Sequence, residues 1–484
     1  MPRQTRRSFL KRATFAGLAT QFTIAGTSAS GRVLGANDRF RIGVCGLNGR
    51  GQAHAGSYAA MDNVELAYVI DPDERVMNRA VGVCNKRAKG YEVQGLADVR
   101  EALDDKNLDA ISVATPNHWH SLMVIWAAQA GKHCYVEKPA SHDIHQGRVA
   151  LEAWKKYGIV VQHGTQNRSD AGYASLHKAI QDGQFGRLNI SYGYACKPRR
   201  GIGFKQAGDP PSHLDWNLWR GPACIDYHGN LVHYNWHWFW PTGNGDLNNQ
   251  GTHQLDMAMW PIDADQGHPV RAMAIGGRFR WDDQGETPNT LFGIAQYPNG
   301  QYVFFNVRNV SHEGYQQQVE NEYYFEDGGK IVRGRYYPKG SDKPQSYSVP
   351  KVEVTPGGCF GSFVRACRAG KPELSNCDMD VAHRSCVLGH LMNNSYRLGK
   401  PVPFNEKAGR FGDNKDAYEH FMKLHEIMRD GVGIPEDKAN YIVGPWLDFD
   451  PKTERFTGEH ADEANELLRD PYHEGFEIPE VDRV

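Results

Sequence analysis

Two short segments carry side chains that could move a proton to or from a hydroxyl group. Lys138, in Glu137-Lys138-Pro139, could stabilise an alkoxide with its charge and, where burial lowers its pKa, share the hydroxyl proton. His253 could act as a general acid or base on the predicted helix over 245–256, where Asn249 lies one turn before it. Lys138, His253 and Asn249 are therefore the candidate catalytic residues for chemistry at an alcohol carbon.

A glycine-rich turn follows the first apolar strand. The pattern predicts a strand over 40–45, a turn over 46–51, a helix over 52–61 and a strand over 64–70 that ends at Asp71. This is the βαβ layout of a dinucleotide site, in which the glycines let the backbone approach a pyrophosphate at a helix N-terminus.

Two residues of this layout bear on which dinucleotide it would bind. Asn48 replaces the usual second glycine, and asparagine tolerates a positive φ better than most residues. Asp71 would hold the adenosine ribose hydroxyls and repel a 2′-phosphate, which favours NAD over NADP.

The alternation of strands and helices continues to residue 163 and predicts a doubly wound parallel sheet. Polar residues lie where its strands end, which is the edge at which such sheets bind ligands. The predicted cofactor-binding residues are Gly46, Asn48, Gly49, Arg50, Gly51, Asp71, Thr115, Pro116, Asn117, His120, Glu137 and Lys138.

Taken in order, these motifs resemble the Gfo/Idh/MocA oxidoreductase family, which includes glucose-fructose oxidoreductase and inositol dehydrogenase. The resemblance covers roughly residues 39–405. It implies a tightly held nicotinamide, a hydride transferred at a carbinol carbon, a cis peptide before Pro139, and a homo-oligomer formed through the open face of the C-terminal sheet. His253 matches the family's catalytic histidine.

Asn249 stands where the family usually has aspartate. An amide can orient a substrate hydroxyl but cannot accept its proton, so the acid–base work falls to His253, with or without Lys138. The alternative is that Asp246 or Asp256 supplies a carboxylate from a shifted position.

Aromatic residues gather between the two catalytic segments. Six of the eleven tryptophans lie within residues 216–260. Flat aromatic faces suit sugar rings, although packing or a subunit interface explains such a cluster equally well. Gln166 and Arg168 follow the last strand of the parallel sheet and are also expected to face the substrate. The predicted substrate-binding residues are Gln166, Arg168, Trp236, Trp238, Asn249 and His253, and no metal site is predicted.

The chain divides into four predicted parts. Residues 1–30 resemble a twin-arginine export signal, because Arg6-Arg7 precedes a short apolar run and a small-residue cleavage pattern. Residues 38–164 form the NAD-binding Rossmann domain, and 165–402 an α+β substrate domain with a large, mostly antiparallel sheet. Residues 403–484 read as a helical and extended tail.

Composition narrows the choice of partners. Lys plus Arg number 55 and Asp plus Glu 57, so the net charge of −2 provides no basic footprint for nucleic acid. The apolar run near the N-terminus is too short for a membrane span. The leading hypothesis is an exported, periplasmic NAD(P)-dependent oxidoreductase acting on a sugar, glycoside or sugar derivative. The alternatives are an NAD-dependent glycosidase that uses transient oxidation and elimination, and a non-catalytic sugar-binding or sensor protein.

Overall fold

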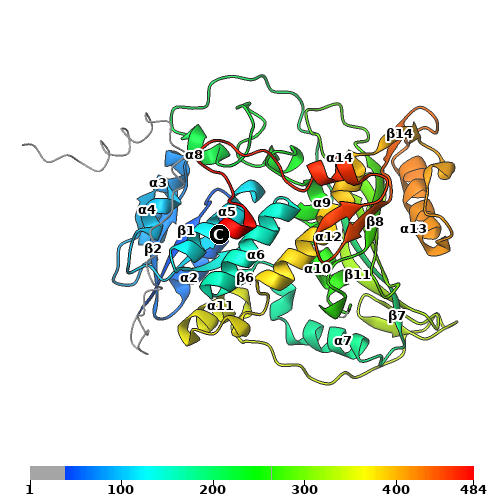
Figure 1. The fold of residues 1–484 in the computed structure, drawn as a ribbon, viewed down its shortest axis with the longest axis horizontal. Helices are drawn as coiled ribbons and strands as arrows, with labels where there is room; N and C mark the ends of the chain where they lie inside the picture. Colours follow the sequence, from blue (N-terminus) through cyan, green and yellow to red (C-terminus); the bar gives the residue numbers. More distant parts are fainter. Residues whose placement is uncertain (1–38, 263) are drawn as a thin grey trace, which may run out of the picture.

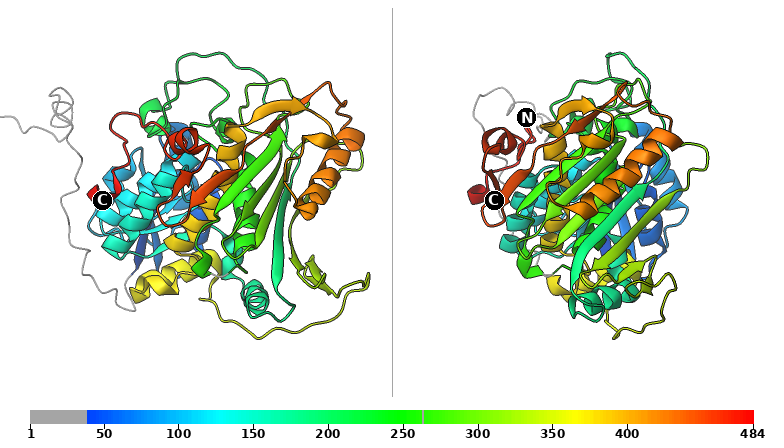
Figure 2. Two further views of the ribbon diagram at one scale, coloured as in Figure 1. Left: turned by 45° about the vertical axis from the view of Figure 1, so that its right-hand side comes forward. Right: turned by 90° about the vertical axis from the view of Figure 1, so that its right-hand side faces the viewer.

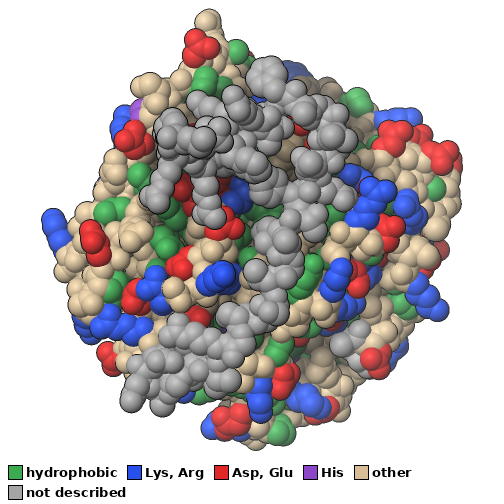
Figure 3. Space-filling model, turned by 60° about the vertical axis from the view of Figure 1, so that its left-hand side comes forward, with side chains coloured by type: hydrophobic (Ala, Val, Ile, Leu, Met, Phe, Trp, Pro, Cys, Tyr) green, Lys and Arg blue, Asp and Glu red, His purple; other side chains and the backbone are tan. Residues whose placement is uncertain are grey.

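Two β-sheets with helices packed between them organise the chain (Figure 1). The structure is a computed structural model that describes residues 39–262 and 264–484. The predicted export signal at 1–30 therefore lies outside the described residues. Among the described residues, no helix combines the length and apolar composition needed to cross a bilayer. Basic and acidic side chains are interspersed over the face drawn in Figure 3.

The N-terminal sheet is parallel, with strand order β3-β2-β1-β4-β5-β6. This confirms the predicted doubly wound Rossmann fold, which the nearly continuous apolar strands indicate. The order reverses between β1 and β4, so the residues after these two strands face one crevice. The strands are β1 (Phe40–Cys45), β2 (Val64–Ile70), β3 (Gln94–Leu96), β4 (Ala110–Val113), β5 (His133–Val136) and β6 (Val161–His163). The helices are α2 (Gly51–Ala60), α3 (Glu74–Asn85), α4 (Val99–Leu103), α5 (His120–Gln129) and α6 (Ile144–Tyr157).

The second sheet is mostly antiparallel, and only its β7–β10 pair runs parallel. The single strand predicted over 330–336 is wrong in one respect. Arg333 and Gly334 both have positive φ (50° and 70°), so the chain turns there and forms two short strands. The strands are β7 (Leu188–Cys196), β8 (Arg271–Gly277), β9 (Thr290–Gln296), β10 (Tyr302–Arg308), β11 (Gln318–Phe325), β12 (Lys330–Val332), β13 (Arg335–Tyr337), β14 (Lys400–Pro403), β15 (Asn440–Val443), β16 (Leu447–Asp450) and β17 (Arg455–Thr457).

Helices cover both faces of this second sheet. The helices α10 (Gly251–Met259) and α12 (Met379–Arg397) lie between the two sheets, and α12 packs on both α6 and β8 (Figure 1). On the opposite face, α13 (Lys415–Glu426) crosses the strands (Figure 2). The remaining helices are α7 (Ala171–Gln181), α8 (Trp216–Arg220), α9 (Gly245–Asn249), α11 (Gly358–Ala369) and α14 (Ala461–Glu466).

The segment predicted as a tail is built into both domains. Its strands β15 and β16 pair with β8 of the second sheet, and the proposed boundary at residue 403 falls at the end of β14. The chain then returns to the Rossmann domain, where Phe476, Ile478 and Val484 join the same buried cluster as Trp119. Apolar residues this far along the chain thus complete the core of the first domain.

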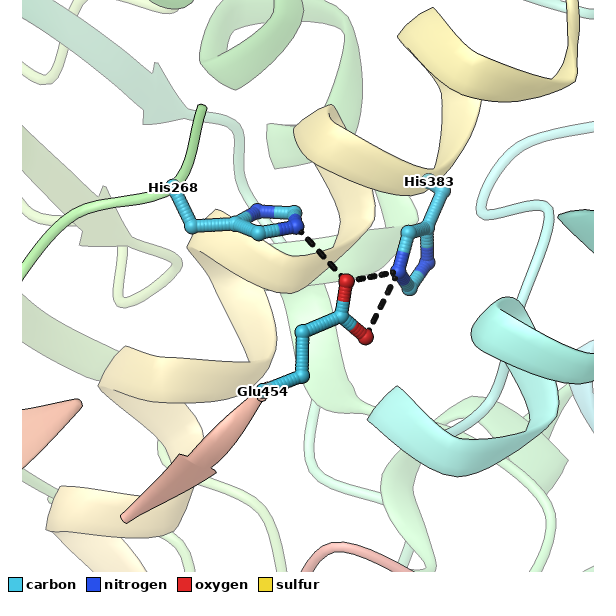
Figure 4. Close-up of side chains that lie close together, drawn as sticks. All are labelled: His268, His383 and Glu454. Carbon is cyan, nitrogen blue, oxygen red and sulfur yellow. Dashed lines mark hydrogen bonds and ion pairs between the residues drawn. The ribbon is translucent and has the colours of Figure 1, made fainter. Parts of the chain in front are cut away.

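A buried carboxylate ties this returning segment to the rest of the molecule (Figure 4). Glu454 has a left-handed backbone (φ 53°), and its carboxylate lies 3.0 Å from Nε2 of both His268 and His383. Arg148 of α6 also pairs with it. Burial alone would raise the pKa of Glu454, but His383 and His268 outweigh this effect and hold the pKa well below its usual range. The carboxylate is therefore the shared acceptor of a buried ionic cluster.

We expect Glu454→Gln to lower the free energy of unfolding by about 2 kcal/mol, because charge-assisted hydrogen bonds from three partners are weakened. Since the folded pKa is depressed, this stability is fully present above the unfolded pKa of ~4.3 and is lost as pH falls through the folded pKa. Thermal melts from pH 3 to pH 7 should show the gap between wild type and variant narrowing below about pH 4. Exposed Glu459→Gln is the matched control; an equal effect of the two substitutions at neutral pH would contradict the role given to the cluster.

Candidate active site

A cavity of about 520 Å³ lies at the carboxyl edge of the parallel sheet, and the segment 197–240 closes its other side. It brings together most of the residues predicted from the sequence, from both domains. The predicted residues that line it are Gly46, Asn48, Gly49, Arg50, Asp71, Thr115, Pro116, Asn117, His120, Glu137, Lys138, Gln166, Trp236, Asn249 and His253.

The glycine turn leaves room for a phosphate group. Gly46 has φ +79°, and a Cβ there would lie 2.7 Å from the backbone of Ala114. A Cβ on Gly51 would lie 1.8 Å from the carbonyl oxygen of Gly46, so this glycine allows α2 to begin against the turn. At Gly49 a Cβ would meet nothing within 4 Å, so the turn is open there. An open turn at a helix N-terminus fits a dinucleotide pyrophosphate.

Asp71 lies at the end of β2 and also lines the cavity. Its carboxylate accepts hydrogen bonds from the backbone N–H groups of Leu47 (2.8 Å) and Asp73 (3.0 Å). These bonds hold a negative charge beside the glycine turn, which suits ribose hydroxyls and disfavours a 2′-phosphate. The residues present therefore fit NAD.

Glu137 is buried behind the turn and remains ionised. Its Oε1 accepts hydrogen bonds from Nε of Arg50 (2.8 Å) and Nε2 of Gln166 (3.4 Å), and it lies 3.0 Å from Nε2 of His54. Burial alone would raise the pKa of Glu137, but His54 and Arg50 hold it well below its usual range. The ion pair with Arg50 joins the glycine turn to the segment that carries Lys138.

Lys138 is held against the start of the helical segment 245–259. Its Nζ donates to the backbone oxygen of Asn249 (2.5 Å) and to Oδ1 of the same residue (3.3 Å). The peptide before Pro139 is cis, as the family resemblance implies. Burial lowers the pKa of Lys138, while Glu137 and Asp246 act in the opposite direction.

Asn249 is oriented by a buried carboxylate one turn earlier. Its Nδ2 donates to Oδ1 of Asp246 (3.0 Å), which leaves Oδ1 of Asn249 facing Lys138. Asp246 is also bonded twice by Arg199 (3.1 and 2.8 Å) and once by Asn309 (2.6 Å). An aspartate at position 249 would place two carboxylates together, so the amide is the group that fits between Asp246 and Lys138.

His253 projects from α10 into the same cavity and is half-buried. Burial, reinforced by the charge of Lys138, lowers the pKa of His253 to about 3. The imidazole is therefore neutral at ordinary pH, so it can form hydrogen bonds but is a weak base.

Three predicted site residues do not line the cavity. Arg168 makes two 2.9 Å hydrogen bonds to Asp256, because a buried guanidinium needs a carboxylate, and this pair removes both residues from substrate chemistry. Trp238 is 5% exposed and packs against Arg199, so its face is not available to a sugar. Gly51 acts through the turn itself. The shifted carboxylates Asp246 and Asp256 are likewise absent from the described residues that line the cavity.

A strap formed by residues 197–240 crosses the cavity, and sequence reasoning missed what anchors it. The strap pairs with the chain after β2 through Asp73 and Leu214, and Asp73 lies 2.8 Å from Nε2 of His233 and 3.1 Å from Nδ1 of His213. An Asp two residues past a strand end looks like an ordinary helix cap, which Asp73 also is for α3. No local signal marks its second partners.

We expect Gly51→Ala to abolish NAD binding and to destabilise the Rossmann domain, because the new Cβ collides with the carbonyl oxygen of Gly46. Gly49→Ala is the matched variant, since its Cβ meets nothing in the protein. It should keep the wild-type melting temperature. Calorimetric titration with NAD and thermal melts check both statements; a stable Gly51→Ala protein that binds NAD normally would contradict the geometry of the turn.

Comparisons with known proteins agree with this geometry. A family model for an oxidoreductase NAD-binding Rossmann fold (GFO_IDH_MocA) matches residues 40–165, and the model for the C-terminal alpha/beta domain of the same family matches residues 204–431. The WlbA dehydrogenase of Bordetella pertussis, solved with NADH and UDP-GlcNAcA, superposes with a TM-score of 0.55 at 20% identity, covering 74% of this chain and 97% of that one. This likeness shows the fold.

Two curated relatives show the range of the family. Levoglucosan dehydrogenase of Pseudarthrobacter phenanthrenivorans is 28% identical over 46% of this chain and 50% of its own length. A glycosyl hydrolase family 109 protein of Shewanella baltica is 30% identical over 34% of this chain and 36% of its own length. The chain spans about half the length, or less, of the curated relatives it matches. With both domain models matched in order over most of its length, the chain belongs to the Gfo/Idh/MocA oxidoreductase family.

Proposed function

We propose that this protein is a nicotinamide-dependent oxidoreductase that acts on a hydroxyl-bearing carbon of a sugar or glycoside. The observation that carries the proposal is the placement of Lys138, whose ammonium group is fixed by Asn249 inside the cavity that the glycine turn opens into. Aromatic side chains of the strap, Trp236 among them, line the same cavity and suit the C–H face of a sugar ring.

The residues divide the work by their protonation. NAD, when bound along the glycine turn and Asp71, supplies the hydride acceptor. Lys138 is the group that takes the proton from the substrate hydroxyl, because its pKa is lowered toward the working range while that of His253 lies near 3. Neutral His253 orients the hydroxyl by a hydrogen bond, and the ammonium charge of Lys138 stabilises negative charge on oxygen.

The strap supports a cofactor that stays bound through many turnovers. Its contacts to Asp73 hold it across the cavity beside the adenosine end, where Asp71 lies. Retention would suit the exported location that the N-terminal sequence predicts. A homo-oligomer formed through the second sheet also stays a prediction.

A second candidate is a redox-assisted glycosidase, and the family 109 glycosyl hydrolase relatives favour it. In that reaction the same Lys138 and His253 would handle the hydroxyl proton, and the oxidation would be reversed before product leaves. The two candidates differ in whether nicotinamide is left reduced after turnover.

We expect protein purified without added nucleotide to release near-stoichiometric NAD(H) on denaturation, and to turn over sugars or glycosides. Reduced nicotinamide accumulating with a keto-sugar product supports the dehydrogenase, whereas free sugar without net reduction supports the glycosidase. Lys138→Met should keep the bound cofactor and lose at least about 100-fold in kcat, since general acid–base groups contribute 10²–10⁴-fold. A protein that neither carries nor binds NAD would overturn the proposal.

The pH profile tests the role given to Lys138. Oxidation should speed up as pH rises through the pKa of Lys138, with a midpoint below the ~10.4 of an ordinary lysine. Asp246 raises that pKa, so Asp246→Asn should move the midpoint to lower pH. Rates between pH 6 and pH 10 check this, with exposed Asp448→Asn as the control. An unmoved or raised midpoint would show that Asp246 does not act on Lys138.

A further inference from the structure

We propose that Tyr234 forms a subsite for a second sugar ring, so that the substrate is a disaccharide or longer glycoside rather than a free monosaccharide. The inference rests on the proposed function and names its substrate class. Tyr234 lies at the rim of the catalytic cavity, and it also lines a second, open cavity of about 530 Å³ on the outer side of the strap. The two cavities therefore meet at one aromatic ring.

Tyr234 is 51% exposed, which makes it one of the few large aromatic side chains among the described residues that present so much surface to water. An exposed tyrosine normally keeps its side-chain freedom, because ordering it costs free energy. Here the ring is fixed. Its hydroxyl oxygen accepts a 2.9 Å hydrogen bond from Nη1 of Arg199, and its centroid lies 4.8 Å from that of His237. His237 is in turn stacked on Trp236 at 3.6 Å.

The fixed ring connects to the catalytic lysine through a short chain of contacts. Arg199 binds Asp246, Asp246 binds Asn249, and Asn249 holds Lys138. Whatever stacks on Tyr234 is thereby placed in a constant position relative to the reacting hydroxyl. A pre-ordered aromatic face at this place gains binding free energy without paying for ordering on contact.

The second cavity has the lining that a sugar ring requires. Polar and basic side chains can bond to hydroxyl groups, and aromatic faces cover C–H groups. Beside Tyr234, its lining includes Arg200, Lys205, Asn230, Asn235 and Trp238. Trp238 is buried beneath, so Tyr234 supplies the accessible stacking face. A ring seated there would be linked to the ring whose hydroxyl faces Lys138 and His253.

Steady-state kinetics on matched pairs test the subsite: glucose, methyl β-glucoside, and the disaccharides cellobiose, lactose and maltose. We expect the best disaccharide to exceed its monosaccharide in kcat/KM. Tyr234→Ala should lower kcat/KM for that disaccharide about tenfold, in line with one lost aromatic contact, and leave the monosaccharide within about twofold. Tyr234→Phe keeps the face but loses the bond to Arg199, so its loss should be smaller. Exposed Tyr173→Ala on α7 is the control.

Binding to the NAD-loaded Lys138→Met protein separates this inference from the proposed function. Calorimetric titration with the same disaccharides should show binding that is lost on adding Tyr234→Ala. Binding of this kind without turnover in the wild type would sustain the subsite and overturn the oxidoreductase proposal. Equal losses on monosaccharide and disaccharide, or no disaccharide binding at all, would overturn the subsite.

Discussion

A buried carboxylate has to be satisfied on every side, and the arrangement around Asp246 follows from that constraint. The residue is fully buried, and its partners come from three directions: Arg199 from the strap, Asn309 from the end of β10, and Asn249 from its own helix. Each bond positions something else. Arg199 fixes the strap, and the amide of Asn249 turns its oxygen toward Lys138. Active-site geometry here is thus a by-product of neutralising one charge.

This constraint also explains a departure that looks damaging in the sequence. An asparagine in place of aspartate beside the catalytic histidine suggests a lost proton acceptor. In the structure the negative charge has moved one helical turn earlier, to Asp246, where it is paired with Arg199 and raises the pKa of Lys138. The site keeps its carboxylate as a positioning group, while the ammonium group of Lys138 remains next to the cavity.

Local patterns predicted well wherever one element carried its own signal. The glycine turn, Asp71 and the Glu137-Lys138-Pro139 segment each follow a strand that reads clearly as apolar, and parallel strands bring their ends to one edge. Side chains whose partners are distant in sequence could not be predicted in this way. Arg168 looked free because Asp256 is 88 residues away, and the bonds from His233 to Asp73 span 160 residues. Tertiary pairing of charges decides such positions, and no spacing rule encodes it.

The return of the C-terminal segment to the Rossmann domain affects how the molecule can move. The ring of Phe476 packs edge-on against Trp119 with centroids 5.4 Å apart, and β16, earlier in the same segment, pairs with β8 of the other sheet. Together with the strap and the direct passage from β6 to α7, this makes three covalent crossings between the halves. A body joined at three separated places resists hinge rotation about any single axis. Access to the cleft is then governed by rearrangement of surface segments, and the relative orientation of the two sheets is preserved throughout the reaction cycle.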